Sequence, residues 1–274
     1  MGNPLNFIRR GANGEIEEPA VDAAIFRQNT EGLYGGVEWS DPPKQVYDAL
    51  MTHPRFVQNF GKTPKAEISV STRIFTKKAT ERILRAAFEH AKKYNYPSVT
   101  LCEKPNVIRE TSGMMYKMAL EIQKNDYPSI ELWNTNIDAQ MMWLTKNPET
   151  YGVLVSENMF GDILSDAAAM LTGSIGMLPS ASLNASGQGM YEPCHGSAPD
   201  IAGQGIANPL ATILSAAMLL RYSLGETEAA DKIEQAVSKV LDQGLRTADI
   251  YSAGTRKVST REMGDAVVAA LVAL

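Results

Sequence analysis

The nine residues NMFGDILSD, 158–166, carry the strongest indication of fold and function in this chain. They lie inside a longer apolar run, LVSENMFGDILSDAAAMLTG, whose spacing predicts a helix. On that helix Asp162 and Asp166 are four residues apart and share one face. Two like charges at this spacing destabilise a helix by roughly 0.2–0.5 kcal/mol, so the pair calls for a positive group that offsets the repulsion.

The composition around this stretch excludes several classes of protein. The 274 residues are 44% hydrophobic and 21% charged, which suits one large or two modest globular domains. A net charge of −5 argues against a nucleic-acid or anionic-membrane partner. Cys102 and Cys194 form no CxxC pair, which argues against structural zinc or disulfides and favours the cytoplasm. The sequence has no signal peptide and no apolar run of about 18 or more residues that could span a membrane.

Strands and helices alternate over much of the chain. Short apolar runs predict strands at 22–26, 97–103, 129–134 and 151–157. Amphipathic patterns predict helices at 76–94, 111–125 and 138–147, and the chain from 208 onward is mostly helical. This alternation predicts an α/β fold. The proline-rich segment 36–70 interrupts it, and we expect a loop with a short helix and a strand, forming an arm that reaches a partner subunit.

Carboxylates form the first candidate site. Asp162 and Asp166, joined by Asp138 in the stretch NIDAQMMW, offer the oxygen ligands that Mg²⁺ and Mn²⁺ prefer. A 2-hydroxy acid could supply the remaining ligands. The alternative is an acid near a helix start beside a solvated neighbour, which is common in proteins.

A second candidate is the loop CHGSAPDIAGQGIANP, 194–209. Its glycines expose the backbone, and Asn208 and Pro209 begin a helix whose N–H groups could face a phosphate. Asp200 could accept hydrogen bonds from both ribose hydroxyls, and its charge would repel a 2′-phosphate. The alternative is a plain surface loop. No GxGxxG follows a strand, so nucleotide binding cannot be argued from the Rossmann fingerprint.

Two further stretches carry polar groups that suit catalysis. In FRQNTEGLYGG, 26–36, Arg27 could bind a carboxylate with two hydrogen bonds. Asn29 would lie on the same strand face as Arg27 if the strand extends that far. Tyr34 could donate a proton. In CEKPNV, 102–107, Lys104 follows a strand at the edge where α/β sheets bind ligands, and a nearby cation would lower its pKa. The alternatives are an exposed arginine, a packed tyrosine and an exposed loop lysine.

Taken together, these stretches resemble one family. RQNTEGLY, KPN, NID, NMFGDILSD and HGSAPDIAGQGIANP follow the order found in the isocitrate/3-isopropylmalate dehydrogenases, which are β-decarboxylating dehydrogenases, and the resemblance runs from about Asp22 to Leu274. It implies an α/β two-domain fold without the usual Rossmann fingerprint. Residues 18–175 would form the small domain for dimerisation, substrate and metal, including the 36–70 arm. Residues 176–274 would be the C-terminal part of the large, NAD-binding domain.

The resemblance also implies a role for each matched residue. Tyr34 would protonate the carbon left by CO₂, and Lys104, given to the neighbouring subunit's site, would help remove the hydroxyl proton. The remaining implied roles are substrate binding by Arg27, Asn29 and Asn106; Mg²⁺ or Mn²⁺ binding by Asp162, Asp166 and the other subunit's Asp138; and NAD binding by His195, Gly196, Ser197, Ala198, Asp200 and Asn208. The expected assembly is therefore a homodimer with shared active sites.

The motifs of this chain divide between two substrate branches of the family. RQNTEGLY and ETSGMM resemble isocitrate enzymes, whereas ENMFGDILSDAAAMLTGSIGMLPSASL and GTRKVSTREMGDAVVAAL resemble 3-isopropylmalate enzymes. Because RQNTEGLY would touch the substrate, we expect NAD-dependent decarboxylation of isocitrate to 2-oxoglutarate, as in the tricarboxylic acid cycle. The alternative is 3-isopropylmalate dehydrogenase of leucine biosynthesis; homoisocitrate or tartrate also suits the chemistry.

The N-terminus departs from the family pattern. GNPLNF, 2–7, resembles a segment that normally follows a first strand and a substrate-binding helix, so we expect the first part of the large domain to be missing. A chain of this kind would have weak activity or none. The other possibility is a non-catalytic partner subunit that pairs with a complete homologue, although the full set of catalytic residues favours an enzyme.

Overall fold

A four-stranded parallel sheet is the centre of the fold. This computed structural model describes residues 7–11 and 13–274, so most of GNPLNF lies outside the described residues. The strands run in the order β3 (Ala24–Arg27), β8 (Val153–Ser156), β6 (Ser98–Glu103) and β7 (Glu131–Asn136). They agree with the four predicted runs to within a few residues. Every residue of β6 and β8 is buried, as in strands of a parallel sheet that is covered on both faces, and the buried residues of β6 include the polar Ser98, Thr100 and Glu103.

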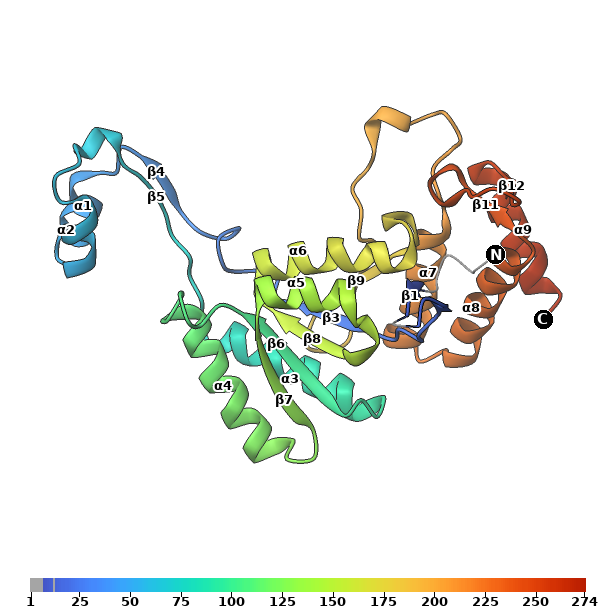
Figure 1. Ribbon diagram of the computed structural model, residues 1–274, viewed down its shortest axis with the longest axis horizontal. Helices are drawn as coiled ribbons and strands as arrows, with labels where there is room; N and C mark the ends of the chain where they lie inside the picture. The colour runs from blue at the N-terminus through green and yellow to red at the C-terminus, as the bar shows by residue number, and fades with distance from the viewer. Residues whose placement is uncertain (1–6, 12) are drawn as a thin grey trace. The chain divides into compact units, whose positions relative to one another are not determined.

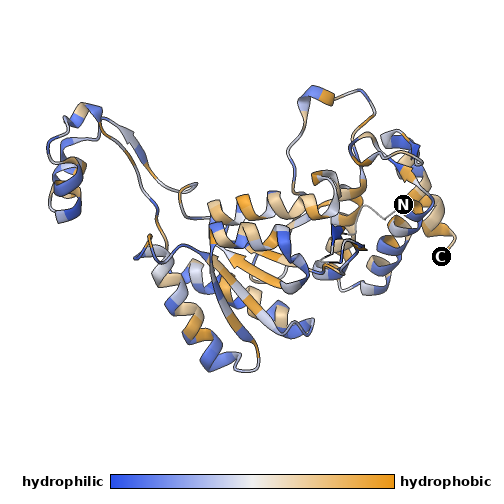
Figure 2. Ribbon diagram, in the orientation of Figure 1, coloured by the Kyte–Doolittle hydropathy of each residue, from blue (hydrophilic) through white to orange (hydrophobic). Residues whose placement is uncertain are grey.

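Two helices cover one face of this sheet, α3 (Lys77–Lys93) and α4 (Thr111–Asp126) (Figure 1). The sheet and the helices share one core, to which β3, β6 and β8 contribute apolar side chains, whereas β7 is largely polar (Figure 2). The fully buried residues of this core include Leu84, Phe88, Val99, Leu101 and Val153. The core therefore fixes the direction of every strand, and with it the edge of the sheet at which the following loops begin.

The segment predicted to be an arm contains more structure than expected. Strands β4 (Glu38–Ser40) and β5 (Ser69–Ser71) form an antiparallel ribbon, and between them lie helices α1 (Lys44–Met51) and α2 (Pro54–Phe60) and a short 3₁₀ turn (Lys65–Glu67). The expectation of one short helix missed α2. Pro54 is tolerated there because it occupies the first turn, where a helix needs no N–H donor, and His53 caps the helix by accepting from Arg55 N.

A second group of elements is largely helical. It contains a hairpin of β9 (Pro179–Leu183) and β10 (Gly189–Pro193), and helices α7 (Leu210–Leu219), α8 (Thr227–Asp242) and α9 (Thr260–Val272). A single π-helical turn, Leu220–Leu224, extends α7. The core of this group includes Met177, Leu210, Val237, Val240 and Met263. Smaller strand pairs are β1 (Arg9–Arg10) with β2 (Ile16–Glu17), and β11 (Leu245–Arg246) with β12 (Arg256–Lys257).

The chain divides into two compact units, and the division crosses α6 (Asn158–Ala169). One unit holds residues 24–140 and 152–162, and the other holds 141–151, 163–274 and the described residues before Ala24. Helix α5 (Ile137–Lys146) is likewise shared between the two units. This division differs from a boundary after residue 175, and the assignment of a small and a large domain stays a prediction.

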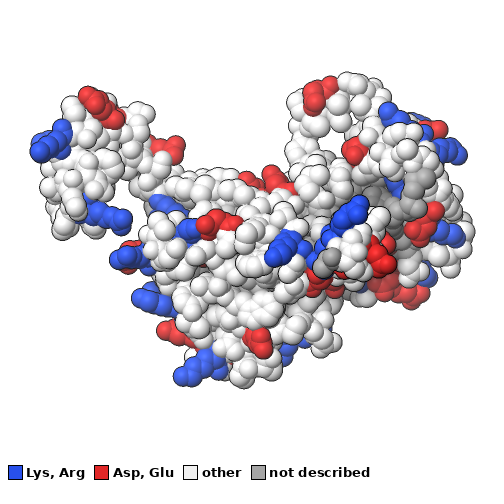
Figure 3. Space-filling model, in the orientation of Figure 1, with Lys and Arg blue, Asp and Glu red and all other residues white. Residues whose placement is uncertain are grey.

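The described residues include no helix with the length and apolar character needed to cross a membrane. On the face drawn in Figure 3, acidic and basic side chains are interspersed over the surface. Neither sign of charge forms a broad patch there.

Candidate active site

The carboxyl end of β3 and the first turns of α6 bring together the first group of predicted residues. Arg27, the last residue of β3, donates from Nε to Asn158 Oδ1 at 2.9 Å and forms an ion pair with Asp162. Tyr34 Oη donates to the other carboxylate oxygen of Asp162 at 2.7 Å. Gly161 permits this close approach, because a Cβ there would lie 2.9 Å from the Cβ of Arg27. Residues distant in sequence therefore meet on one carboxylate.

This group is open to solvent and keeps a proton available. The side chains of Arg27 and Asp162 are 31% and 36% exposed, and Tyr34 is 56% exposed. The hydrogen bond to Asp162, reinforced by partial burial, raises the pKa of Tyr34 above its ordinary value. The phenol therefore stays protonated throughout the neutral range and can act as a proton donor.

The loop between Arg27 and Tyr34 is held by its own side chains. Gln28 is 7% exposed, and its amide oxygen accepts from Thr30 N at 3.1 Å and from Glu31 N at 3.0 Å. Glu31 turns to the start of α3, where it accepts from Thr76 N at 2.7 Å and from the Thr76 hydroxyl at 2.6 Å. Asn29 is exposed and lies beyond the last residue of β3, so the strand does not extend far enough to put it on the same strand face as Arg27.

A second pair follows strands β6 and β7. Lys104 forms an ion pair with Asp138, and the hydrogen bond from Lys104 lowers the pKa of that carboxyl. The side chain of Asp138 is 67% exposed, and that of Lys104 is 23% exposed. Asn106 lies in the exposed turn after β6. The structure thus joins the predicted base to the aspartate that we expected to serve the other subunit's metal.

The three predicted metal ligands do not meet within one chain. Among residues 7–11 and 13–274, no three His, Cys, Asp or Glu side chains form a group that could hold an ion. Asp162 and Asp166 nevertheless occupy successive turns of α6, and Asp166 is exposed. Two carboxylates at one helix face fit the oxygen preference of Mg²⁺ or Mn²⁺. In a single chain it is the guanidinium of Arg27 that offsets the charge of Asp162.

The predicted cofactor segment lies in the other unit and has an unusual backbone. Ala198 adopts a left-handed conformation with φ of 45°, and Gly203 and Gly205 have φ of 77° and 66°. A non-glycine residue held in this region is costly and is found most often at functional sites. The ring of His195 hydrogen bonds to Gly196 O at 2.7 Å, and the residues from Gly196 to Asp200 are exposed. The segment therefore offers backbone and side-chain groups to a ligand.

Residues 4–267 match the sequence profile of the isocitrate/isopropylmalate dehydrogenases. The chain belongs to this family. It is 51% identical over 258 residues to 3-isopropylmalate dehydrogenase from Pseudomonas fluorescens, covering 92% of this chain and 64% of the relative. It is 60% identical over 197 residues to the enzyme of that name from Bordetella avium, covering 72% and 54%. The chain thus spans less than two thirds of the length of these curated relatives.

A solved member of the dehydrogenase family also matches. Isocitrate dehydrogenase from Methylococcus capsulatus superimposes with a TM-score of 0.78 at 34% identity, covering 98% of this chain and 74% of that one. The α/β fold expected from the motifs is therefore confirmed. The relatives' names favour 3-isopropylmalate, the alternative of the sequence analysis, over isocitrate.

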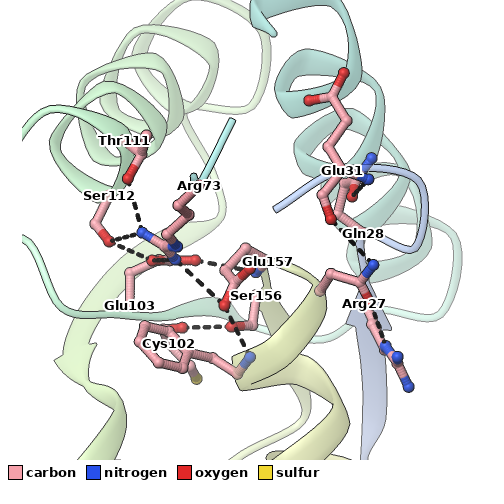
Figure 4. A network of polar contacts seen from close by, with 12 residues as sticks. Arg27, Gln28, Glu31, Arg73, Cys102, Glu103, Thr111, Ser112, Ser156 and Glu157 are labelled. Atoms are coloured by element: carbon pink, nitrogen blue, oxygen red, sulfur yellow. Dashed lines mark hydrogen bonds and ion pairs between the residues drawn. The ribbon is translucent and has the colours of Figure 1, made fainter. Parts of the chain in front are cut away.

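A buried ionic network that the sequence motifs did not predict lies near the first site (Figure 4). Arg73 lies 3.2 Å from a carboxylate oxygen of Glu103 and 3.2 Å from one of Glu157. Its other terminal nitrogen donates to Thr111 Oγ1 at 2.7 Å and to Ser112 Oγ at 3.1 Å. The sequence contains one indication of this network. The stretches SVTLCE and VLVSE, which contain the two fully buried strands, both end in glutamate. An acid that ends a buried strand calls for a cation.

This network joins the segments that carry the predicted catalytic groups. Glu157 N donates to Glu103 Oε1 at 3.0 Å, and Glu157 Oε1 accepts from Phe160 N at 2.9 Å in the first turn of α6. Burial raises the pKa of Glu103, while the neighbouring Ser112 hydroxyl and Arg73 guanidinium act in the opposite direction. Lys104 follows Glu103 directly. The network therefore holds the backbone before Lys104 and the backbone at the start of α6.

Asn208 is placed differently from the expectation. Its side-chain oxygen accepts from Leu210 N at 2.9 Å, and its amide nitrogen donates to Asp249 at 3.0 Å. The side chain predicted to bind NAD is therefore engaged with the protein. It also occupies the first N–H group of α7, one of the groups that we expected to be available to phosphate.

Proposed function

We propose that the chain is a subunit of an NAD-dependent dehydrogenase that oxidises and decarboxylates 3-isopropylmalate. The observation that carries the proposal is the convergence of Arg27 and Tyr34 on Asp162 at the carboxyl end of the parallel sheet. In this proposal Arg27 would be the anion-binding group, Tyr34 the proton donor and Asp162 a ligand of the metal ion. The names of the relatives support the substrate.

Each side chain in this group has a task in such a reaction. The guanidinium of Arg27 binds a substrate carboxylate, and the phenol of Tyr34 delivers a proton to the carbon from which CO₂ leaves. Lys104 would accept the hydroxyl proton in its neutral form, which a nearby metal cation favours. Mg²⁺ or Mn²⁺ held by Asp162, Asp166 and a second chain's Asp138 would polarise the hydroxyl and keto oxygens as a Lewis acid. NAD at 195–208 would accept the hydride, and the charge of Asp200 favours it over NADP.

Substrate choice rests on the loop that separates Arg27 from Tyr34. The motif RQNTEGLY pointed to isocitrate on the assumption that it touches substrate. Gln28 is buried within the loop, however, and Glu31 caps α3. Gln28 departs from the glutamate usual in the isocitrate branch, and Glu31, which does match that branch, serves local structure. The motif therefore carries less weight against 3-isopropylmalate.

We propose that the assembly is a homodimer in which each site takes Lys104 and Asp138 from the other chain. Two surfaces support it. The arm has an apolar groove lined by residues that include Trp39, Val46, Leu50, Phe56 and Phe60. In the other unit, Met142, Ile163 and Met170 of the α5–α6 region and its continuation are 54%, 48% and 63% exposed. Exposed apolar surface of this kind marks interfaces.

The test measures NADH formation by the purified chain with Mg²⁺ and either 3-isopropylmalate or isocitrate. However low the rate of this chain is, we expect a higher kcat/KM for 3-isopropylmalate than for isocitrate, and no activity after Tyr34→Phe or Asp162→Asn. Tyr251→Phe, at an exposed tyrosine of the other unit, is the matched control and should leave the rate unchanged. A preference for isocitrate would overturn the substrate, and NADH formation that survives Asp162→Asn would overturn the site.

A further inference from the structure

We propose that Asp249 is a positioning residue for the cofactor segment, 195–208. Its carboxylate joins Asn208, at the end of that segment, to Ser174 and thereby fixes the backbone where α7 begins. The inference rests on the proposed function, because it takes this segment as the NAD site. No motif of the sequence analysis pointed to Asp249, which lies in the stretch RTADIY near the C-terminus.

Three hydrogen bonds hold the carboxylate. Ser174 Oγ donates to Oδ2 of Asp249 at 2.6 Å, and Asn208 Nδ2 donates to the same oxygen at 3.0 Å. Thr247 Oγ1 donates to the other oxygen at 2.6 Å. Partial burial would raise the pKa of Asp249, but these three donors outweigh it and lower the pKa. The acid is therefore charged at neutral pH, which strengthens each hydrogen bond.

The packing around this carboxylate leaves no room for a different arrangement. A Cβ on Gly176 would lie 2.9 Å from Oδ2 of Asp249 and 2.9 Å from the Cβ of Asn208. Gly176 N itself donates to Ser174 Oγ at 3.1 Å. Thr247 is completely buried. Ser174 and Thr247 are thus held by their own surroundings, so the carboxylate that they bind can set the position of the Asn208 amide.

The segment before α7 is fastened on a second side as well. Thr260, the first residue of α9, donates from its backbone N to Gly205 O at 2.9 Å and from its hydroxyl to Ala207 O at 2.5 Å. Residues 205–208 therefore lie between two anchors, Thr260 and Asp249. Both the oxygen and the nitrogen of the Asn208 amide are hydrogen bonded to the protein. Asn208 would therefore contribute to NAD binding by holding the backbone of the segment. Asp249 would set the orientation of the Asn208 amide.

The experiment compares Asp249→Ala and Asp249→Asn in the full chain. NAD affinity is measured by calorimetry, and hydrogen exchange is measured at the Leu210 amide. Alanine removes all the acceptors, so we expect NAD binding to weaken about tenfold or more and exchange at Leu210 to accelerate by a similar factor. Asparagine can turn its oxygen to Ser174 and Asn208 and its NH₂ to the Thr247 hydroxyl, so it should rescue most of both effects.

Asp265→Ala removes an exposed acid from the same unit and should change neither measurement. Ser174→Ala deletes one donor, keeps Asp249 itself, and should accelerate exchange at Leu210 less than Asp249→Ala does. If Asp249→Ala changes neither exchange nor affinity, the positioning role is wrong. If Asp249→Asn is as damaging as alanine, charge rather than hydrogen bonding matters, and the role is also wrong. Failure of the unmodified chain to bind NAD would refute the proposed function, while exchange at Leu210 would still test the anchor.

Discussion

At the scale of single residues, local sequence predicts which side chains are candidates for function better than it predicts which side chains they contact. Arg27, Tyr34 and Asp162 were all identified as candidates, but their convergence on one carboxylate depends on a strand and a helix that are far apart in sequence. Arg73 was not identified, because nothing near it in sequence is acidic. Of its two carboxylate partners, Glu103 ends β6 and Glu157 directly follows β8. Only the folded sheet brings those strand ends to the same place.

The first prediction concerns that arginine. Arg73→Met leaves two buried carboxylates without their cation, so we expect the free energy of unfolding to fall by about 3–5 kcal/mol. The side chain of Arg73 is only 11% exposed, so solvent screens little of this loss. Urea unfolding measures it. Arg109→Met, at an exposed position in the same unit, should have little effect.

The double variant Arg73→Met with Glu103→Gln gives a sharper test. Removing one carboxylate charge together with the guanidinium should cost less than the sum of the two single substitutions. Simple additivity would mean that Arg73 and Glu103 do not interact.

At the scale of elements, the spacing of apolar residues along the chain predicts most of the strands and helices. The four strands of the sheet and the main helices were predictable, because buried strands read as apolar runs and surface helices show one apolar face. The arm was less predictable. Four prolines in a short segment indicate a loop, yet two of them precede or begin a helix. Whether such a segment becomes a ribbon with two helices depends on strand pairing, which local sequence does not encode.

The second prediction concerns the start of α9, where Ser259 and Glu262 form a reciprocal capping box. Ser259→Ala should lower the free energy of unfolding by about 1 kcal/mol at neutral pH. Hydrogen bonds from the backbone and hydroxyl of Ser259 lower the pKa of Glu262. A carboxyl with a depressed pKa stabilises the fold above its unfolded pKa, and that contribution is lost as the pH falls through the folded value.

The effect of Ser259→Ala should therefore shrink in acid, which urea titrations on both sides of the ordinary glutamate pKa would measure. Arg261→Ala, in the same turn of α9, is the control and should show no such pH dependence. An effect of Ser259→Ala that is constant with pH would mean that Glu262 takes no part in the cap.

At the scale of the whole molecule, the sequence could give the family but not the division into units. The motifs occur along the chain in the family's order, whereas the compact units interleave three separate stretches of it. The same scale governs the proposed assembly. Lys104 pairs with Asp138, and Asp162 pairs with Arg27, so the two halves of the proposed shared site form separate groups in one chain.

The third prediction follows from such a shared site. Lys104→Ala and Asp162→Asn should each abolish NADH formation, but hybrid dimers of the two variants contain one intact site. Random mixing makes half of the dimers hybrid, so about a quarter of the original activity should return. Lys104→Ala mixed with Asp138→Ala gives no intact site and should restore nothing. Equal recovery in both mixtures, or none in either, would refute sharing in this form.

The strand order affects how this protein folds during its synthesis on the ribosome. Ala24 pairs with Val153, and β8 lies between β3 and β6 in the sheet. During synthesis β3 therefore leaves the ribosome long before β8, the strand with which it pairs in the described sheet, and it stays unpaired while more than a hundred residues are added. Closing so long a loop is slow, and a waiting strand can be captured by another nascent chain. Heterologous production should therefore benefit from low temperature and from chaperones that shield early strands.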